Sequence, residues 1–268
     1  MTSIAVTSLR DGWRLTITAA ARGLAADQRA ELIEQALGAA RGTAGIALRR
    51  SRHATSFRVA LRSGSPREVF IKVLERESGL KRLKTLVRGP RAAHVARVTE
   101  SLCAAGLNAP PVLIYGEEAA RGREIILTAR AEGEGPFKAM GASLASRRAM
   151  LRALGREIAR LHRAGFVHGD LTPFNLFVVL GEPPRFVFID HERTRRTFIV
   201  GRRRRQLRNL VQLGRFDLPG LTRSDRMRVL RAYIDALGRP NRRRLMRRAA
   251  AMLARRVRRD GFERAHRG

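Results

Sequence analysis

The sequence is short of cysteine and of long apolar runs, and each shortage excludes a class of protein. Its 268 residues contain one cysteine, Cys103, which rules out an intrachain disulfide and fits a reducing cytoplasm. Cys103 lies between Leu102 and Ala104 in a helical pattern, so we predict that it is buried. No spacing of cysteine and histidine indicates a zinc site. No run reaches the roughly 18 to 20 apolar residues of a transmembrane helix, and the N-terminal residues lack the pattern of a signal peptide. Any membrane contact is therefore expected to be peripheral.

Acidic and aromatic residues are also scarce. The chain has 23 Asp and Glu against 55 Lys and Arg, which gives a net charge of +32. That excess is more than solubility requires and predicts an anionic partner or surface, either nucleic acid or an anionic membrane. A genome rich in arginine codons would explain part of it. Aromatic residues make up 5%, which leaves few platforms for stacking single-stranded bases, while 44% hydrophobic residues predict a globular protein.

A motif of polar residues lies in the second half of the chain, within LHRAGFVHGDLTPFNLFVVLGEPPRFVFIDHE. Asn175 follows Asp170 by five residues, and Asp190 ends the apolar run 186–189. Phosphoryl transfer from ATP needs one carboxylate that orients the attacking hydroxyl, and an amide and a second carboxylate that hold Mg²⁺ against the phosphates. We predict Asp170 as the catalytic residue and Asn175 and Asp190 as metal ligands. Taken singly, each also fits a loop or turn residue.

HGDLTPFNLFV followed by FIDHERTRR resembles the lipopolysaccharide core kinases, bacterial sugar kinases that phosphorylate Kdo or heptose on lipid A. The resemblance runs from about Arg49 to about Tyr233 and is most specific between residues 154 and 196. This family typically carries Asp-x-Glu where protein kinases carry Asp-Phe-Gly, and residues 190–192 match that variant.

The resemblance implies an α+β, protein-kinase-like fold with two lobes. An N-lobe built on an antiparallel sheet is expected over residues 1–130, and a mainly helical C-lobe over residues 131–268. The spacing after Asp190 leaves room for only a short activation segment, and Gly169 replaces the arginine that reads activation-loop phosphate in many protein kinases. We therefore expect a constitutively competent enzyme. Asn209 stands where the family usually has Asp, which weakens a substrate role for its helix.

Lys72 is predicted to hold the phosphates of ATP. It follows the apolar residues 69–71 on a predicted strand and shares a face with Phe70 and Leu74. A lysine among apolar neighbours is costly without an anionic partner, and in kinases the lysine of the third strand meets the α- and β-phosphates. An edge lysine that reaches out to solvent is the alternative.

The loop over residues 50–55 is expected to cover the phosphates, although it contains no glycine. Protein kinases have G-x-G-x-x-G here, whereas lipopolysaccharide kinases tend to have arginine-rich, glycine-poor loops. Ser51, Arg52 and backbone N–H groups are predicted to bind phosphate, and an exposed basic hairpin is the alternative. Backbone groups near Ala129 and Ala131 are expected to meet the adenine.

Three residues are accessory candidates. Glu100 is the one acidic residue of a predicted helix over residues 91–105 and a candidate partner for Lys72, but it lies late in that helix and a solvated glutamate is the alternative. Glu192 is either a metal or substrate ligand or the partner of a nearby arginine. His168 is expected to have a structural role.

Periodicity predicts the other elements. Strands are expected at about 13–17, 45–50, 55–61, 68–74, 111–115 and 124–129, and helices at about 27–40, 91–105, 143–163, 206–218, 222–237 and 241–266. The last helix is intensely basic, with Leu245, Ala249, Leu253 and Val257 on one side. Its arginines form either a solvated face or a contact with anionic lipid head groups.

The sequence thus predicts an ATP- and Mg²⁺-dependent kinase of a sugar hydroxyl in the lipopolysaccharide inner core. It would be cytoplasmic and peripheral to the inner face of the cytoplasmic membrane, with an anionic glycolipid acceptor and no specific nucleic-acid partner. A compact Ser/Thr protein kinase or another small-molecule phosphotransferase is the alternative; an aminoglycoside kinase ranks lower because cationic acceptors call for an acidic site. A pseudokinase or basic binding module is the alternative of another class.

Overall fold

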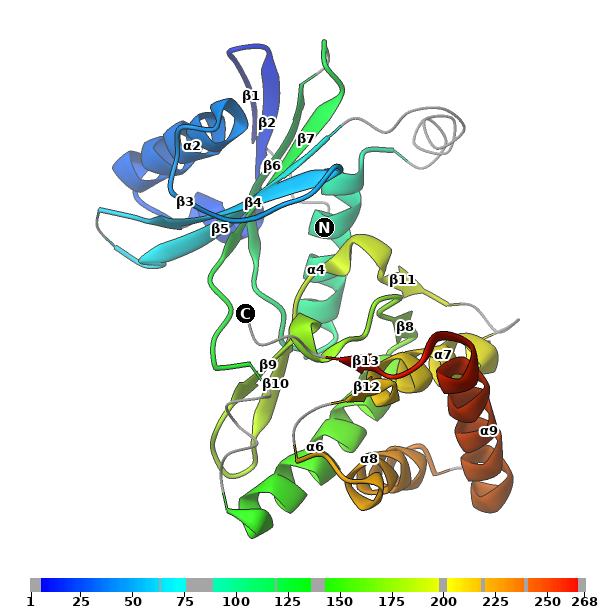
Figure 1. Ribbon diagram of the computed structural model, residues 1–268. Helices are drawn as coiled ribbons and strands as arrows, with labels where there is room; N and C mark the ends of the chain where they lie inside the picture. Colours follow the sequence, from blue (N-terminus) through cyan, green and yellow to red (C-terminus); the bar gives the residue numbers. More distant parts are fainter. Residues whose placement is uncertain are drawn as a thin grey trace. The chain divides into compact units, whose positions relative to one another are not determined.

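The computed structural model describes residues 6–62, 64–75, 89–118, 120–135, 143–197, 202–217, 220–238 and 241–264. Contacts divide the chain into two compact units, one of Met1–Cys103 with Pro110–Arg130 and one of Ala104–Ala109 with Ala131–Gly268. The first unit contains an antiparallel sheet and the second is mainly helical (Figure 1). The predicted α+β class is confirmed. In the part of the chain that the structure describes, no helix combines the length and the apolarity needed to cross a bilayer.

The first unit is built on a seven-stranded sheet in the order β1-β2-β6-β7-β5-β4-β3, with antiparallel neighbours throughout. Its strands are β1 (Val6–Arg10), β2 (Trp13–Ile17), β3 (Ile46–Arg50), β4 (Ala54–Ala60), β5 (Glu68–Leu74), β6 (Val112–Glu118) and β7 (Arg123–Ala129). Sequence periodicity predicted all of these strands except β1. The Asp11-Gly12 turn between β1 and β2 is a hairpin signal that marks the missing strand.

Helices pack against both faces of this sheet (Figure 1). The short helix α1 (Ala19–Arg22) and the longer α2 (Ala26–Arg41) contribute to the larger core, in which Leu32 packs with Ile71 and other residues of the sheet. Helix α4 (Arg91–Ala104) covers the opposite face, where Val95 joins a smaller cluster that includes Leu74.

The N-terminus of α4 contacts a buried carboxylate, and one residue near its C-terminus is more exposed than predicted. Glu124 on β7 is 6% exposed and accepts hydrogen bonds from Arg91 Nε at 3.2 Å and from the N–H of Ala92 at 2.7 Å. A carboxylate is therefore fixed at the helix N-terminus, where the helix dipole favours negative charge. The prediction that Cys103 is buried is wrong, because Leu102 is on the buried stripe of α4 and Cys103 is exposed beside it.

Four long helices dominate the second unit: α6 (Leu144–Arg163), α7 (Arg202–Gly214), α8 (Arg223–Ala236) and α9 (Arg242–Asp260). Helices α6 and α8 approach closely at Gly155, where any Cβ would collide with the carbonyl oxygen of Val229. The predicted bounds of two helices are wrong. Helix α7 starts and stops earlier than predicted, and α9 ends at Asp260 because Gly261 leaves the helical conformation.

Short elements connect these helices. Strands β9 (Leu176–Val179) and β10 (Arg185–Phe188) form an antiparallel hairpin, β8 (Phe166–Val167) pairs with β11 (Arg195–Arg196), and β12 (Phe216–Asp217) pairs in parallel with β13 (Glu263–Arg264). Two 3-10 turns, η1 (Pro173–Asn175) and η2 (His191–Arg193), carry much of the predicted motif. Residues 104–109 group with this unit because Asn108 bonds to β10 through its side chain and its backbone.

A buried ion-pair cluster at the start of α8 gives a first prediction. Asp225 is fully buried and is held by Arg147 at 2.7 Å, by Arg228 at 2.6 Å and by a capping box with Thr222. Burial alone would raise its pKa, but the hydrogen bonds from Thr222 and the charge of Arg147 lower the pKa of Asp225 below its usual range.

We expect Asp225→Ala to lower the free energy of unfolding of the second unit by about 3 kcal/mol, because the arginines lose their carboxylate and α8 loses its cap. Glu132→Ala removes an exposed pair with Arg185 and is expected to change stability by less than about 0.5 kcal/mol. Urea denaturation followed by circular dichroism measures both. Equal effects of the two changes would contradict the role given to Asp225.

Candidate active site

The predicted catalytic loop lies in the second unit, between β8 and β9. Asp170 is half-buried, and its Oδ1 accepts a hydrogen bond from Nε2 of Gln212 on α7. The Nδ2 group of Asn175 donates to the carbonyl oxygen of Asp170 at 2.8 Å. Because the amide nitrogen is bound to the loop, the amide oxygen is the atom that Asn175 can offer to a cation.

Asp190 is held next to this loop by backbone hydrogen bonds of the preceding residue. The N–H of Ile189 donates to the carbonyl oxygen of Asn175 at 3.1 Å, and the carbonyl oxygen of Ile189 accepts from Nε2 of His168 at 2.9 Å. Asp190 itself is exposed and has left-handed backbone angles, with φ 61° and ψ 67°. Such a conformation is uncommon for a residue other than glycine and is typical of functional sites. The structure thus joins the segments that carry all three predicted catalytic and metal-binding residues.

Two buried histidines support this junction. His168 and His191 have ring centroids 5.3 Å apart, and Nε2 of His191 donates to the carbonyl oxygen of Phe188 at 3.0 Å. Burial lowers the pKa of His168, and burial together with the neighbouring His168 lowers the pKa of His191 to about 3. Both rings are therefore neutral at physiological pH. The burial of His168 and its bond to Ile189 are consistent with the structural role expected of it.

Uncharged side chains of α7 hold the catalytic loop from the helical side. Oδ1 of Asn209 accepts from the N–H of His168 at 3.0 Å and lies 3.2 Å from Nε2 of His162, whose Nδ1 lies 2.8 Å from the hydroxyl of Tyr233. Since the amide oxygen can only accept, His162 donates through Nε2 and Tyr233 donates to Nδ1. Asn209 is thus a buried support of the loop backbone.

Gln206, Asn209 and Gln212 form an amide stripe on α7, at a spacing of three residues. Gln206 donates to the carbonyl oxygen of His162 at 3.3 Å, and the other two bind the catalytic loop directly. Sequence reasoning missed Gln206 and Gln212. Their signal was the occurrence of uncharged amides at helical spacing in a segment otherwise made mainly of arginine and aliphatic residues.

The remaining predicted residues of the first unit lie on its sheet and on α4. Lys72 is half-buried on the face of β5 that α4 covers, the same face as Leu74, as predicted. Ser51 stabilises the turn between β3 and β4, since its hydroxyl oxygen accepts a hydrogen bond from the N–H of Ala54 at 3.1 Å. Arg52 is exposed in that turn. Glu100 is exposed on α4.

Ala129 ends β7, Ala131 follows two residues later and Glu192 lies in η2. The N–H of Ala129 donates to the carbonyl oxygen of Pro111 at 3.0 Å, so it is already used within the first unit. Ala131 is buried at the start of the second unit's long segment. Glu192 is half-buried in η2, between His191 and Arg193.

The donor set fits Mg²⁺ better than a transition metal. Within the described ranges, no group of three or more His, Cys, Asp or Glu side chains is arranged to hold a metal ion. Mg²⁺ is usually bound in nucleotide enzymes by one or two carboxylates, with phosphate oxygens and water as the other ligands. An amide oxygen from Asn175 and the carboxylate of Asp190 are oxygen donors of this kind.

Comparisons with known proteins agree with the motif. The family model described as "Lipopolysaccharide kinase (Kdo/WaaP) family" matches residues 50–233. A curated protein of Archaeoglobus fulgidus, named "Probable serine/threonine-protein kinase BUD32 homolog", is 31% identical over 132 residues, which cover 49% of this chain and 55% of that protein. The chain therefore spans about half the length of this curated relative. The predicted resemblance and the protein-kinase-like fold are confirmed.

Gly169 provides a prediction about the loop. It has φ +76°, and any Cβ there would collide with the carbonyl oxygen of Arg193, whereas Gly165 has φ +87° and open space around it. We expect Gly169→Ala to destabilise the second unit by roughly 3 kcal/mol and Gly165→Ala by only about 1 kcal/mol, because only the first adds a steric clash to the strained φ. Thermal and urea denaturation measure both variants. Similar losses would contradict the close approach at Gly169.

The neutral histidines predict a pH dependence. His191 has its ordinary pKa of 6.5 in the unfolded state and about 3 in the folded state, so the unfolded state binds more protons between these values. The free energy of unfolding is therefore expected to fall as pH decreases from 7 to 5, with a slope of at most about 1.4 kcal/mol per pH unit for this residue. His191→Phe should reduce the slope. An unaltered slope in His191→Phe would contradict the assignment.

Proposed function

We propose that the chain, which belongs to the lipopolysaccharide kinase (Kdo/WaaP) family, transfers the γ-phosphoryl group of ATP to a sugar hydroxyl of the lipopolysaccharide inner core, on Kdo or heptose. This family comprises phosphotransferases with an alcohol group as acceptor. The observation that carries the proposal is the pair of hydrogen bonds that fixes Ile189, and with it Asp190, beside the loop of Asp170 and Asn175.

Asp170 is the catalytic residue of this proposal. The bond from Gln212 occupies Oδ1 and leaves Oδ2 for the acceptor hydroxyl. As the acceptor oxygen bonds to the γ-phosphorus, the bond from phosphorus to the oxygen that bridges to the β-phosphate breaks, Asp170 takes the hydroxyl proton and ADP leaves. Asn175 and Asp190 would hold Mg²⁺, which neutralises charge on the phosphates when bound.

The first unit, together with the connecting segment, is proposed to bind the nucleotide. Lys72 is proposed to meet the α- and β-phosphates, because it lies half-buried on β5, and kinases hold these phosphates with a lysine on a strand of this sheet. Ser51 and Arg52 are placed on a hairpin turn whose backbone and guanidinium could add contacts to phosphate. Ala131 would meet the adenine through its backbone.

The charge distribution supports an anionic acceptor. Arg193, Arg195 and Arg196 follow Asp190 within a few residues and all three are exposed. Together with the net charge of +32, they favour a phosphorylated or carboxylated sugar and a position at the anionic inner face of the cytoplasmic membrane. No specific nucleic-acid partner is proposed.

A compact Ser/Thr protein kinase is the second candidate function. The observation in its favour is the 31% identity with a protein named as a probable kinase of that class. The two functions differ in the acceptor and not in the handling of ATP, so a panel of acceptors separates them.

The test is the consumption of ATP by purified protein with a Kdo- or heptose-bearing lipid A, with sugar-free lipid A and with protein acceptors. Turnover is expected only with the sugar-bearing acceptor and Mg²⁺. Asp170→Asn should lower kcat by about 10³-fold without changing the circular dichroism spectrum, since the new amide can still accept from Gln212. The exposed control Glu182→Gln should keep full activity. Full activity of Asp170→Asn would reject the catalytic role, and phosphorylation of protein alone would favour the second candidate.

A further inference from the structure

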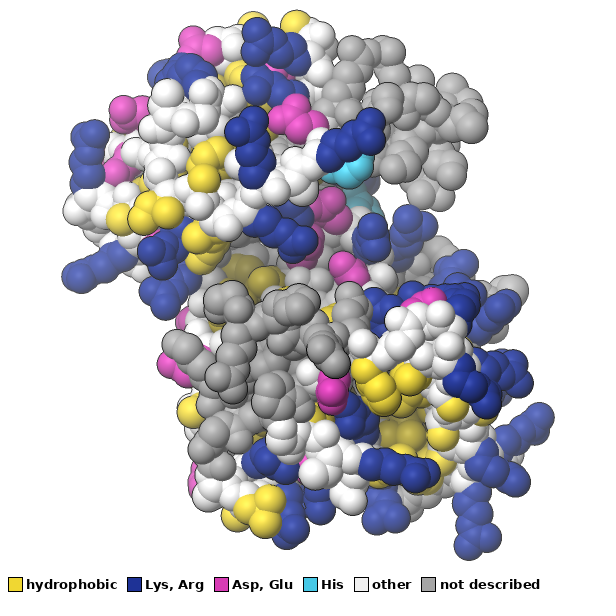
Figure 2. All heavy atoms as spheres, in the orientation of Figure 1, with side chains coloured by type: hydrophobic (Ala, Val, Ile, Leu, Met, Phe, Trp, Pro, Cys, Tyr) yellow, Lys and Arg dark blue, Asp and Glu magenta, His cyan; other side chains and the backbone are white. Residues whose placement is uncertain are grey.

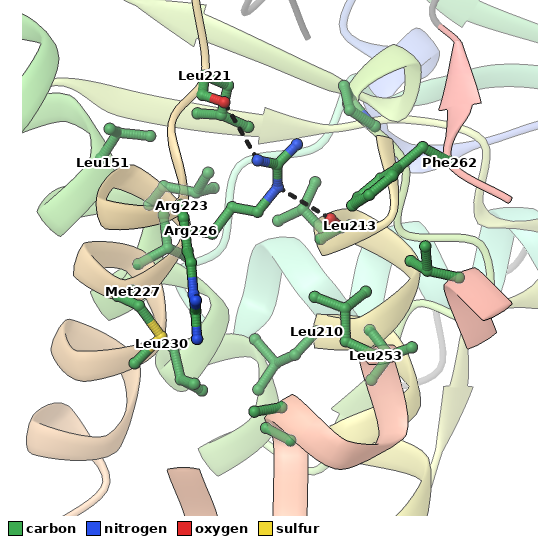
Figure 3. Close-up of a pocket in the computed structure, with 18 of the residues that line it drawn as sticks. Leu151, Leu210, Leu213, Leu221, Arg223, Arg226, Met227, Leu230, Leu253 and Phe262 are labelled. Carbon is green, nitrogen blue, oxygen red and sulfur yellow. Dashed lines mark hydrogen bonds between the residues drawn. The ribbon is translucent and has the colours of Figure 1, made fainter. Parts of the chain in front are cut away.

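The second unit contains an apolar cavity of about 560 Å³ between helices α6, α7, α8 and α9 (Figure 3). Its walls are mainly aliphatic: Leu151 of α6, Leu210 of α7, Leu230 of α8 and Leu253 of α9 face it. Cavities that bind small molecules typically have volumes of about 300 to 1,000 Å³. The cavity therefore has the size of a ligand site.

The apolar side chains around the cavity are not fully covered by the protein. Met227, Leu230 and Leu253 are only half-buried, although protein interiors are normally packed as densely as organic crystals. The walls offer few polar partners, so a water molecule in the cavity would form few hydrogen bonds. When an apolar group enters the cavity, both the group and the cavity wall lose contact with water. This burial is the main source of affinity for such ligands.

Arginines at the cavity differ in what they already bind. Arg226 donates to the carbonyl oxygens of Gly214, Phe216 and Leu221 at 2.9 to 3.1 Å, so it stabilises the wall (Figure 3). Arg223 of α8 and Arg258 of α9 also line the cavity, but both are exposed. Among the residues that the structure describes, neither has an ion-pair or hydrogen-bond partner. In the lower half of Figure 2, apolar side chains form a recess that Lys and Arg side chains surround.

We propose that this cavity binds a single acyl chain that ends in an anionic group. The aliphatic walls accept a chain that needs no hydrogen bonds, and the guanidinium groups of Arg223 and Arg258 bind the carboxylate or phosphate at its end. The proposal does not depend on the proposed kinase activity, because it concerns cavity-lining residues other than Asp170, Asn175 and Asp190.

The cavity also contacts the back of the catalytic loop. Pro173 and Leu176, on either side of Asn175, belong to its lining. Both side chains are already buried, so a bound chain would pack against them and oppose movement of the segment between them. Binding is therefore expected to raise the melting temperature of the second unit, by mass action on the folded state.

The first test measures binding of palmitic acid, lysophosphatidic acid and the uncharged analogue hexadecanol to detergent-free, full-length protein, by displacement of a fluorescent fatty acid. Leu230→Trp/Leu253→Trp fills the cavity and should weaken binding of all three by at least about tenfold. Leu180→Trp, at a site that is 61% exposed and outside the cavity, should bind like the wild type. Circular dichroism checks that each variant is folded. The two anionic probes separate a fatty acid from a phosphate-bearing lipid as the preferred ligand.

The second test uses exposed residues, so folding is not at risk. Arg223→Gln/Arg258→Gln should weaken binding of palmitic acid by about tenfold and leave hexadecanol unchanged. The control Arg152→Gln/Arg255→Gln removes the same charge from exposed positions outside the cavity and should have little effect. A diazirine-bearing fatty acid should crosslink to α8 or α9 at the cavity. No binding by the wild type, equal loss in both arginine pairs, or crosslinks confined to other surfaces would each overturn the proposal.

Discussion

The peptide group of Ile189 is the interaction on which the rest of the site depends. Its N–H is bound by the carbonyl oxygen of Asn175 and its carbonyl oxygen by the ring of His168, so two segments about twenty residues apart in sequence are fixed at one point. The left-handed conformation of Asp190 follows directly after this point. Short polar side chains can act together on a phosphate only if their backbones are held in this way.

The support of the loop is made mostly of neutral groups. Asn209, His162 and Tyr233 form one hydrogen-bonded chain beneath the loop, and His168 and His191 are kept uncharged by burial. A chain with so few acidic residues has few carboxylates available for buried ion pairs. The main exception in the second unit is Asp225, which is shared by two arginines at the start of α8. Neutral amide and histidine side chains thus form the supporting hydrogen bonds, in place of buried ion pairs.

Sequence periodicity predicted most elements, because period-two and helical patterns are local properties, whereas the fold class and the family followed from the resemblance of the motif around Asp170 and Asp190. It placed Lys72 on the correct face of β5 from alternation alone. It did not find β1, the end of α9 or the exposure of Cys103, since these depend on a turn, on one glycine and on where a helix stripe ends. The partner of Gln212 and the cavity in the second unit were also beyond its reach, because long-range packing creates both, although the spacing of the amides on α7 was visible in the sequence.

The amide stripe on α7 has a consequence for work at a charged interface. Hydrogen bonds between neutral groups respond little to ionic strength, whereas exposed ion pairs weaken as counterions accumulate. Near a leaflet of acidic lipids, local salt and local pH both differ from the bulk. Because Gln206, Asn209 and Gln212 carry no charge, the hydrogen bonds that they form around the catalytic loop depend little on such changes in salt.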